Sequence, residues 1–570
     1  MSVSGQYRSG RGDRAFPAFR HTESLPKGLR RGAALNDRPG KQAADDRCGE
    51  DETVPGTERR SGRRSGGSRR GGGESSVLDR QRPFKQITNP FPPIAPMNTD
   101  QLERVHDISM RIIEEIGIEV MSTDARRRLR DVGAKVDDGT GIVRMDRALV
   151  TDLVAKAPET FTLTPWNPER TVRIGGNVIN FGMVSGPPNV HDAIRGRRPG
   201  NFADYKDLMK LAQSFNVITM FGNQTLAPTD LPANSRHLDT YLANLTMTDK
   251  VFSGMSIGSG RVRDLMEMQA IARGLSVEDL AGSPSAITNI NVNSPRKLDR
   301  EMSDAATTLA EKGQAVVVTP FTLMGAMTPV TLPAALAQQN AEALLTIALI
   351  QAVRPGAPVI YGCFTSNVDM RTGAPAFGTP ENAWANLAGG QLARRYNLPY
   401  RTSACNASNM ADAQSVYETE MALWGAVMGH GNLVYHAAGW LEGGLVASFE
   451  KLILDVEILQ NMAAFLEPVD FSDAEFAFEA IRDTAPGGHF FGAGHTMERF
   501  KTAFYEPMVS DWQNHENWEL AGARDASMRA TDIWQEALTR YEAPPLPSDR
   551  REALEAYVAR RKEDIGSGEP

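Results

Sequence analysis

The sequence alternates short apolar segments with longer amphipathic segments eight times between residues 178 and 466. The short segments are rich in β-branched and aromatic residues, a composition typical of buried strands. We expect strands at 178–183, 217–223, 250–255, 286–292, 315–320, 358–363, 400–405 and 433–438. The amphipathic segments predict helices at 202–214, 235–248, 261–273, 296–312, 332–353, 380–396, 412–429 and 448–465.

Eight strand-and-helix units in about 290 residues match the size of a (β/α)8 TIM barrel. The alternative is an open, doubly wound sheet. Such sheets often carry a glycine-rich dinucleotide-binding turn after their first strand, and the repeats here lack one. We therefore predict an α/β protein with a closed TIM barrel over residues 178–466.

The residues on either side of the repeats predict additional layers. Residues 97–177 predict an N-terminal cap of three helices and a hairpin, with hairpin strands at 160–164 and 171–174. Residues 467–570 predict a C-terminal helical extension, with helices near 517–541 and 549–562. These segments are expected to pack on the barrel.

Residues 1–96 have a different composition. They contain arginine pairs among glycine and serine and almost no aliphatic pattern, so we predict a disordered tail. An arginine-rich tail suits nucleic-acid contact, membrane-surface contact or an organelle presequence. Acidic residues are interspersed throughout, which favours a solvated tail without such a role.

Charge and cysteine content exclude several protein classes. The net charge of −8 gives no electrostatic reason to expect nucleic acid as a partner. No apolar run approaches the roughly 20 residues that cross a bilayer, so no membrane association is expected. Three cysteines, in no zinc-binding spacing, suit a reducing cytoplasm. The sequence leaves open whether the protein forms a homo-oligomer.

In a TIM barrel the carboxyl ends of the strands converge on the active site. The last two expected strands carry polar or sulfur-bearing residues there, and Cys405, Asn406 and His436 are the catalytic candidates. The carboxyl ends of the other strands and the loop after the last strand add candidates for ligand binding: Asn223, Phe321, Tyr361, Trp440 and Glu442.

This set of candidates carries few charges, which limits the chemistry. Metal-dependent hydrolysis needs clustered His, Asp and Glu, whereas His436 and Glu442 stand almost alone, so we expect no metal site. Schiff-base chemistry needs a lysine at a strand end, and Lys250 lies at the wrong end of its strand. A mouth rich in amide, aromatic and sulfur groups suits a small amine or a large flat cofactor.

Each candidate also has a purely structural interpretation. Cys405 has the size and polarity of a small buried hydrophobic residue, and His436 suits a core position in which its hydrogen bonds are satisfied. Tyr361 and Trp440 suit packing at the top of the barrel as well as a ligand cage.

Several segments together resemble the trimethylamine methyltransferase family. They are Pro358-Val359-Ile360-Tyr361-Gly362, Asp369-Met370-Arg371-Thr372-Gly373, Phe377-Gly378-Thr379-Pro380-Glu381, Asp412-Ala413-Gln414, Gln338-Gln339-Asn340-Ala341-Glu342 and His495-Thr496. The resemblance covers about residues 97 to 545 and depends on the whole set. It implies a TIM barrel that moves a methyl group from a methylated amine to the cobalt of a corrinoid. The corrinoid (cobalamin) is carried by a separate protein, so no tightly bound cofactor is expected.

The archaeal trimethylamine enzymes of this family carry pyrrolysine, and this chain contains only standard residues. The resemblance places pyrrolysine in the region of Cys405 and Asn406. Its absence favours the branch that resembles glycine betaine methyltransferases. Attack of cobalt(I) on a quaternary amine expels a neutral amine that needs no proton, so the protein need only align the substrate and exclude water.

The expected substrate site combines an aromatic cage and polar donors. The cage would come from Tyr361, Trp440, Phe181, Phe221 or Phe321, and donors for a carboxylate from Asn223, Asn406, His436 or Arg401, with Glu442 nearby. The leading hypothesis is a methyltransferase for glycine betaine or a similar quaternary amine. The alternatives are trimethylamine or another methylamine as the methyl donor, and a non-catalytic barrel that binds betaine.

Overall fold

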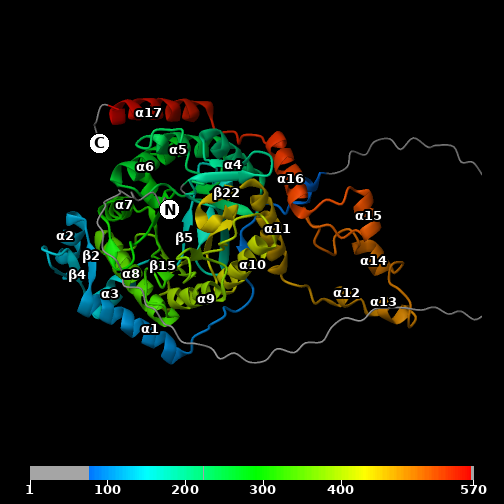
Figure 1. The fold of residues 1–570 in the computed structure, drawn as a ribbon, viewed down its shortest axis with the longest axis horizontal. Coiled ribbons are helices and arrows are strands. Elements are labelled where there is room, and N and C mark those ends of the chain that lie inside the picture. The colour runs from blue at the N-terminus through cyan, green and yellow to red at the C-terminus, as the bar shows by residue number, and fades with distance from the viewer. Residues whose placement is uncertain (1–75, 223, 567–570) are drawn as a thin grey trace, which may run out of the picture. The chain divides into compact units, whose positions relative to one another are not determined.

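The computed structural model describes residues 76–222 and 224–566. Within them, eight parallel strands form a closed barrel (Figure 1), and an isolated bridge between Gly254 and Thr288 joins the first and last strands of the hydrogen-bonded path. In chain order the strands are β7 (Val178–Met183), β10 (Ile218–Phe221), β11 (Val251–Phe252), β12 (Ile287–Ile290), β14 (Ala315–Val318), β16 (Val359–Gly362), β19 (Tyr400–Ser403) and β20 (Leu433–Ala438). The predicted TIM barrel is confirmed.

A helix follows each barrel strand, and all eight predicted helices are present with small shifts at their ends. Side-chain caps fix several starts: the side chains of Asn201, Thr379 and Asp412 each accept a backbone N–H of the first turn. The helices are α4 (Phe202–Ser214), α5 (Arg236–Met247), α6 (Ser259–Arg273), α7 (Arg300–Glu311), α8 (Leu332–Val353), α9 (Pro380–Arg395), α10 (Ala413–Met428) and α11 (Phe449–Phe465).

The barrel interior is closed at its amino end by the predicted hairpin, β5 (Phe161–Leu163) and β6 (Val172–Ile174). Leu163, Val172 and Ile174 are fully buried. They belong to one hydrophobic cluster with inward-facing side chains from most of the barrel strands. The barrel members of this cluster are Met220, Val251, Ile287, Ala315, Val317, Ile360, Leu433 and Tyr435. The hairpin is therefore a plug that completes the inner core.

The N-terminal cap contains α1 (Thr99–Arg111), a π-helical turn η2 (Ile112–Ile116), α2 (Thr123–Asp131) and α3 (Arg147–Val154), close to the predicted helices. It also contains a small sheet that the sequence analysis did not predict. This sheet joins β2 (Ile118–Val120), β3 (Lys135–Val136) and β4 (Ile142–Arg144) to β13 (Lys297–Leu298) from the loop after β12. Strands of two or three residues are too short to show an alternating pattern.

Residues 76–96 differ from the expectation of a disordered tail that extends to residue 96. They form η1 (Val77–Arg80) and β1 (Ile87–Thr88), which pairs antiparallel with β7. Asn89 is fully buried and donates to the carbonyl of Val427. Isolated contacts of this kind leave no periodic pattern, so composition alone misplaced the boundary. The rest of the predicted tail lies outside the described residues.

Two small sheets stand above the carboxyl end of the barrel. Strands β15 (Phe321–Met324) and β17 (Phe364–Val368) follow β14 and β16 directly and pair in parallel, with β18 (Pro375–Ala376) beside β17. The second sheet contains β8 (Asn189–Asp192), β9 (Gly196–Pro199), β21 (Trp440–Leu441) and β22 (Val446–Ser448). Short 3-10 turns lie at η3 (Pro168–Arg170), η4 (Asp279–Gly282) and η5 (Glu442–Gly444).

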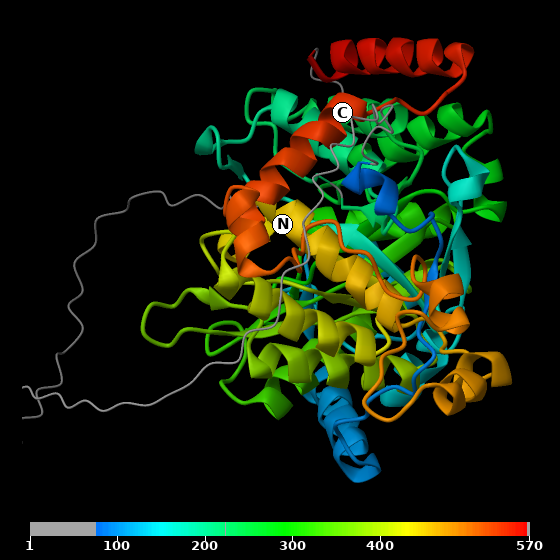
Figure 2. The ribbon, with the colours of Figure 1, turned by 90° about the vertical axis from the view of Figure 1, so that its right-hand side faces the viewer.

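The C-terminal extension is helical, as predicted, but the expected helix 517–541 is two helices. Gly522 and Ala523 adopt φ of 97° and 49°, which ends α15 (His515–Leu520) before α16 (Ala526–Arg540). Helix α17 (Ser548–Gly566) lies along α5 and α6, where Tyr557 donates to Asp264 (Figure 2). The remaining helices are α12 (Asp473–Phe476), α13 (Phe478–Asp483) and α14 (Gly494–Arg499).

Among the described residues, none of the helices has both the length and the apolar character that crossing a membrane requires.

The hairpin plug gives a direct test of the fold. Leu163→Ala removes a fully buried side chain from the inner core and should lower the free energy of unfolding by about 2 to 5 kcal/mol. Thr162→Ala, on the exposed face of the same strand, is the control and should cost less than about 1 kcal/mol. Denaturant unfolding measures both. Equal effects would show that the hairpin does not plug the barrel.

Candidate active site

Side chains along β19 point alternately into the barrel and out toward the helices, and this decides which of them reach the interior near its carboxyl end. Tyr400 and Thr402 face outward, since their hydroxyls donate to the backbone and side-chain oxygens of Asn386 on α9. Arg401, between them, therefore faces inward. Its guanidinium lies 5.2 Å from the ring centroid of Tyr435, a member of the inner core.

Arg401 is the most unusual residue of this interior, because it is a fully buried cation without a carboxylate partner among the described residues. Its guanidinium also lies 5.0 Å from the ring centroid of Phe364, and Nη2 is 3.2 Å from Nε2 of His436. Nε and Nη1 have no hydrogen-bond partner. Burial lowers the pKa of Arg401 to about 10, so it stays charged at neutral pH.

The contacts of Arg401 do not satisfy all the hydrogen-bonding groups of its buried charge. Burying an ion costs several kcal/mol even after relaxation. The two aromatic faces return about 0.5 to 2 kcal/mol each, and the contact with neutral His436 adds about 1.5 to 3 kcal/mol as a charged hydrogen bond. Two of the three guanidinium nitrogens still lack acceptors. An anion bound at Arg401 would supply them.

His436 reaches the same interior because β20 is irregular. The pairing of β20 with β7 shifts register between Val434 and Ala438, and His436 adopts φ of 58°. A shift of this kind turns a side chain from one face of a sheet to the other. Tyr435 and His436 therefore lie beside each other, with ring centroids 6.1 Å apart. Strained backbone of this kind is common at functional sites.

The protonation of His436 follows from its neighbours. Burial, and secondarily the charge of Arg401, hold its pKa well below the usual range, so the ring is neutral at physiological pH. Because Arg401 has only donors, Nε2 accepts and the proton is assigned to Nδ1. Nδ1 is buried and has no partner. His436 thus offers a second free donor near Arg401.

Aromatic side chains surround this pair. The His436 ring lies 4.3 Å from Trp440 and 5.7 Å from Phe364 between centroids. Phe377 lies 5.9 Å from Trp440 and 5.5 Å from Phe364, and Phe321 lies 4.9 Å from Phe364. We call Phe321, Phe364, Phe377 and Trp440 the aromatic cluster. Phe321 is its partly exposed member, whereas the other three are buried.

Asn406 and Trp440 hold the ends of β19 and β20 together. The Asn406 side chain donates to the Trp440 carbonyl (2.6 Å), and the Trp440 indole donates to the Asn406 carbonyl (2.9 Å). Behind them, the carboxylate of Asp455 accepts from the backbone of Gly439 and pairs with Lys451 inside the core. These bonds fix the chain that carries His436 and Trp440.

The inner face also needs a glycine. A Cβ at Gly182 would lie 2.7 Å from the Tyr435 ring, so only glycine lets this ring enter the barrel. Above it, Thr319 Oγ1 and Asn289 Oδ1 are buried without hydrogen-bond partners. The interior is therefore apolar at the plug and polar toward the carboxyl end.

The structure brings His436, Asn406, Trp440 and Phe321 together but separates other predicted residues from them. Tyr361 faces outward and donates to Gln339 and Asn340 on α8, so it does not lie at the mouth. Phe181 is on the opposite face of β7 from Gly182, and Phe221 stacks on Phe252 in the helix layer. The difference is explained by alternation along each strand, which turns neighbouring side chains to opposite faces.

Three further candidates have their own outcomes. Glu442 forms a two-pronged ion pair with Arg197 of β9, at 2.9 Å and 3.0 Å, so its carboxylate is already partnered. Cys405 is buried, and burial raises the pKa of its thiol far above the usual range, which keeps it neutral. Asn223 lies outside the described residues. No cluster of His, Cys, Asp and Glu among the described residues could hold a metal ion.

Sequence reasoning missed Phe364 and Phe377 as members of the aromatic cluster and gave Arg401 no special weight. Phe364 follows an expected strand end directly, and Phe377 lies in one of the segments that carry the family resemblance. An arginine inside an expected barrel strand, with no acidic residue beside it in that strand, was the strongest available signal, because charged residues are rarely fully buried.

The low pKa of His436 predicts a pH effect. The unfolded chain binds a proton near pH 6.5 that the folded chain refuses, so this residue lowers stability as the pH falls below about 6.5. His436→Asn removes the effect. Between pH 7.5 and 5.5 the wild type should lose about 1 kcal/mol more unfolding free energy than the variant. Equal losses would show that His436 is protonated in the fold.

Comparison with known proteins shows which family this chain resembles. The model of the family described as trimethylamine methyltransferase (MTTB) matches residues 59–566. The chain is 35% identical to the glycine betaine methyltransferase of Desulfitobacterium hafniense (strain Y51), over 82% of this chain and 98% of that protein. It is 26% identical to the proline betaine:corrinoid methyltransferase of Eubacterium limosum, over 81% and 96%.

Other relatives are more distant. The trimethylamine methyltransferase MttB of Methanosarcina barkeri (strain Fusaro) is 25% identical, over 81% of this chain and 94% of that protein. The solved structure of the Methanosarcina barkeri monomethylamine methyltransferase (MtmB) aligns with a TM-score of 0.47 at 9% identity, over 80% and 90%. With a match that spans most of its length, the chain belongs to the trimethylamine methyltransferase family and is a methyltransferase.

Proposed function

We propose that this methyltransferase takes a methyl group from a small quaternary amine that bears a carboxylate, with glycine betaine as the leading substrate. The acceptor is the cobalt of a corrinoid carried by a separate protein. Two relatives are named as betaine methyltransferases, and one of these names includes corrinoid. The observation that carries the proposal is the buried, unpaired guanidinium of Arg401.

Arg401 supports a carboxylate-bearing substrate for electrostatic reasons. Charges inside proteins are almost always paired, and arginine is a common partner of carboxylates. Nε and Nη1 of Arg401 each have a free N–H that can donate to an anion, and Nδ1 of His436 is a further donor. A betaine would bring the missing anion. Trimethylamine has no carboxylate and would leave the cation unpaired.

The aromatic cluster supports the other end of the substrate. A trimethylammonium group is attracted to aromatic faces, by about 0.5 to 2 kcal/mol per contact. Trp440 and Phe364 both lie beside His436, and Phe364 also contacts Arg401. A betaine bound with its carboxylate on Arg401 would place its cationic head against these rings. Partly exposed Phe321 then lies toward the side from which the methyl acceptor approaches.

The state of the site suits methyl transfer without proton transfer. A quaternary amine leaves as a neutral tertiary amine, so no general acid is required. His436 is held neutral, and Cys405 is held as a neutral thiol. The corrinoid cobalt supplies the nucleophile that accepts the methyl group. This chain orients the substrate and excludes water, while Asn406 acts as a positioning residue through Trp440.

Two alternatives have less support. Relatives in this family are named for trimethylamine, but they are 26% identical or less, and trimethylamine leaves Arg401 without a counter-charge. A barrel that only binds betaine would be unlike the relatives compared above, which are named methyltransferases.

The test is methyl transfer to free cobalamin reduced to cobalt(I). With glycine betaine the purified protein should form methylcobalamin, which is followed by its absorption spectrum. Carnitine, proline betaine and trimethylamine are run in parallel. No transfer from any betaine would overturn the proposal, and transfer from trimethylamine alone would establish the first alternative. Tight betaine binding without turnover would establish the second.

A further inference from the structure

The hydroxyl of Thr319 lies in the barrel interior and has no hydrogen-bond partner among the described residues. Thr319 follows β14 directly, and its backbone N–H donates to the carbonyl of Ile290, so the residue continues the ladder between β14 and β12. Its side chain is fully buried. Leaving a buried hydroxyl unpaired destabilises a fold, so this position carries a cost that the barrel itself does not require.

Packing alone does not account for a threonine at this position. The residues of β14, Ala315–Val318, are all apolar and fully buried. Valine is branched at Cβ like threonine and would fill the same space without burying a polar atom that lacks a partner. A ligand that accepts a hydrogen bond would give the hydroxyl the partner it lacks.

The glycine at position 362 shows where the hydroxyl points. Gly362 faces the interior, because Ile360, two residues earlier on β16, belongs to the inner core. A Cβ on Gly362 would collide with Oγ1 of Thr319. The hydroxyl therefore occupies the space on the inner side of Gly362 that a side chain would otherwise fill.

Arg401 borders the same space. Gly362 pairs with Arg401 between β16 and β19, and Val318 pairs with Tyr361 between β14 and β16. Thr319, Gly362 and Arg401 are thus consecutive members of one row across three neighbouring strands, and all three face inward. The middle member of the row contributes no side chain that would separate the Thr319 hydroxyl from Arg401.

The aromatic cluster lies one step nearer the mouth than this row. Phe321 comes two residues after Thr319, and Phe364 comes two residues after Gly362. The two phenylalanines pair in register between β15 and β17, with ring centroids 4.9 Å apart. Two residues of strand rise about 6.6 Å. The guanidinium of Arg401 lies 5.0 Å from the Phe364 ring centroid, so the polar row and the aromatic rings adjoin.

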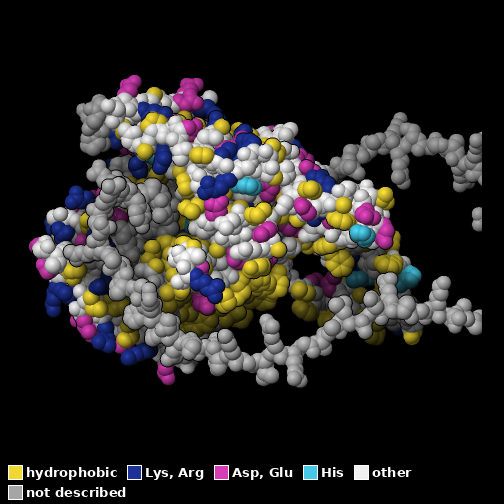
Figure 3. Space-filling view, viewed as in Figure 1, with side chains coloured by type: hydrophobic (Ala, Val, Ile, Leu, Met, Phe, Trp, Pro, Cys, Tyr) yellow, Lys and Arg dark blue, Asp and Glu magenta, His cyan; other side chains and the backbone are white. Residues whose placement is uncertain are grey.

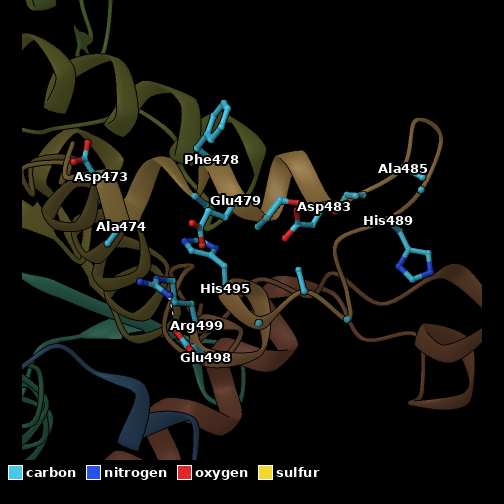
Figure 4. Close-up of a pocket in the computed structure, with 17 residues that line it drawn as sticks. Asp473, Ala474, Phe478, Glu479, Asp483, Ala485, His489, His495, Glu498 and Arg499 are labelled. Atoms are coloured by element: carbon cyan, nitrogen blue, oxygen red, sulfur yellow. Dashed lines mark hydrogen bonds and ion pairs between the residues drawn. The ribbon is translucent and has the colours of Figure 1, made fainter.

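Charges on the visible outer surface lie near opposite charges. Figure 3 shows basic and acidic side chains interspersed over this face. A groove of about 1050 Å³ opens between α13 and α14 (Figure 4), and its Arg499 already pairs with Glu475 and Glu498. The donors near Arg401 are instead buried and unpaired, the condition in which an anion gains most from binding.

We propose that Thr319 determines substrate specificity, because its hydroxyl donates to the same substrate carboxylate that pairs with Arg401. This inference rests on the proposed function. A carboxylate has two oxygens with about four acceptor sites. Nε and Nη1 of Arg401, Nδ1 of His436 and Oγ1 of Thr319 are all unpaired in the structure, so the set of donors suits that capacity. The carboxylate lies over Gly362, and the trimethylammonium head lies against the aromatic cluster.

The test is calorimetric binding of glycine betaine, and of tetramethylammonium as a ligand without a carboxylate, to the full-length protein. Thr319→Val removes the hydroxyl and keeps the branched shape. It should weaken glycine betaine binding about 10-fold or more, the scale for a hydrogen bond to a charged group, and leave tetramethylammonium binding unchanged. Thr319→Ser keeps a hydroxyl and should bind both ligands as the wild type does.

Thr402→Val is the matched control, because Thr402 is equally buried and lies next to Arg401 but donates outward to Asn386. This variant should unfold at a lower temperature than the wild type and keep the wild-type ratio of the two affinities. Thr319→Val should unfold at an equal or higher temperature, because it removes an unpaired buried hydroxyl.

The outcomes separate this inference from the proposed function. Unchanged betaine binding in Thr319→Val, or equal weakening of both ligands, would overturn the inference and leave the proposed function intact. So would a loss in Thr319→Ser as large as in Thr319→Val, or a fall in unfolding temperature for Thr319→Val that matches Thr402→Val. A wild type that does not bind glycine betaine would overturn both.

Discussion

Closure of eight parallel strands into a barrel decides which residues of this protein can act together. Each strand must turn alternate side chains inward, and the interior holds only a few layers of them. The β5–β6 hairpin and apolar residues fill the amino end. The carboxyl end receives Arg401, Tyr435, His436 and the buried polar atoms above them. Every proposed role in the site follows from this division.

Hydrogen bonds and an ion pair behind the site hold the polar half of the interior in place. Reciprocal hydrogen bonds between Asn406 and Trp440 connect the ends of two strands, and Asp455 with Lys451 secures the turn at Gly439. Burial raises the pKa of Asp455, a sign of how unfavourable its position is without Lys451. This supporting layer lets His436 keep a backbone conformation that a free chain would avoid.

The sequence was sufficient to predict the barrel, because strands and helices have different hydrophobic patterns and the strand–helix unit is repeated eight times. It was insufficient for the site because period alone does not say which face of a strand is inward. Tyr361 was assigned to the mouth and lies on the outer face, whereas Arg401 lies inward. The register shift that turns His436 inward leaves no trace in composition. The domain boundaries at residues 178 and 467 stay predictions.

We propose that Arg401 is unpaired in the free protein because a substrate carboxylate pairs with it. Calorimetric binding of glycine betaine and of tetramethylammonium, which has no carboxylate, to wild type and Arg401→Gln tests this directly. Loss of a charged hydrogen bond is worth about 1.5 to 3 kcal/mol, so the variant should bind glycine betaine about 10- to 150-fold more weakly and tetramethylammonium no more weakly than the wild type does. An equal loss for both ligands, or none for betaine, would contradict the claim.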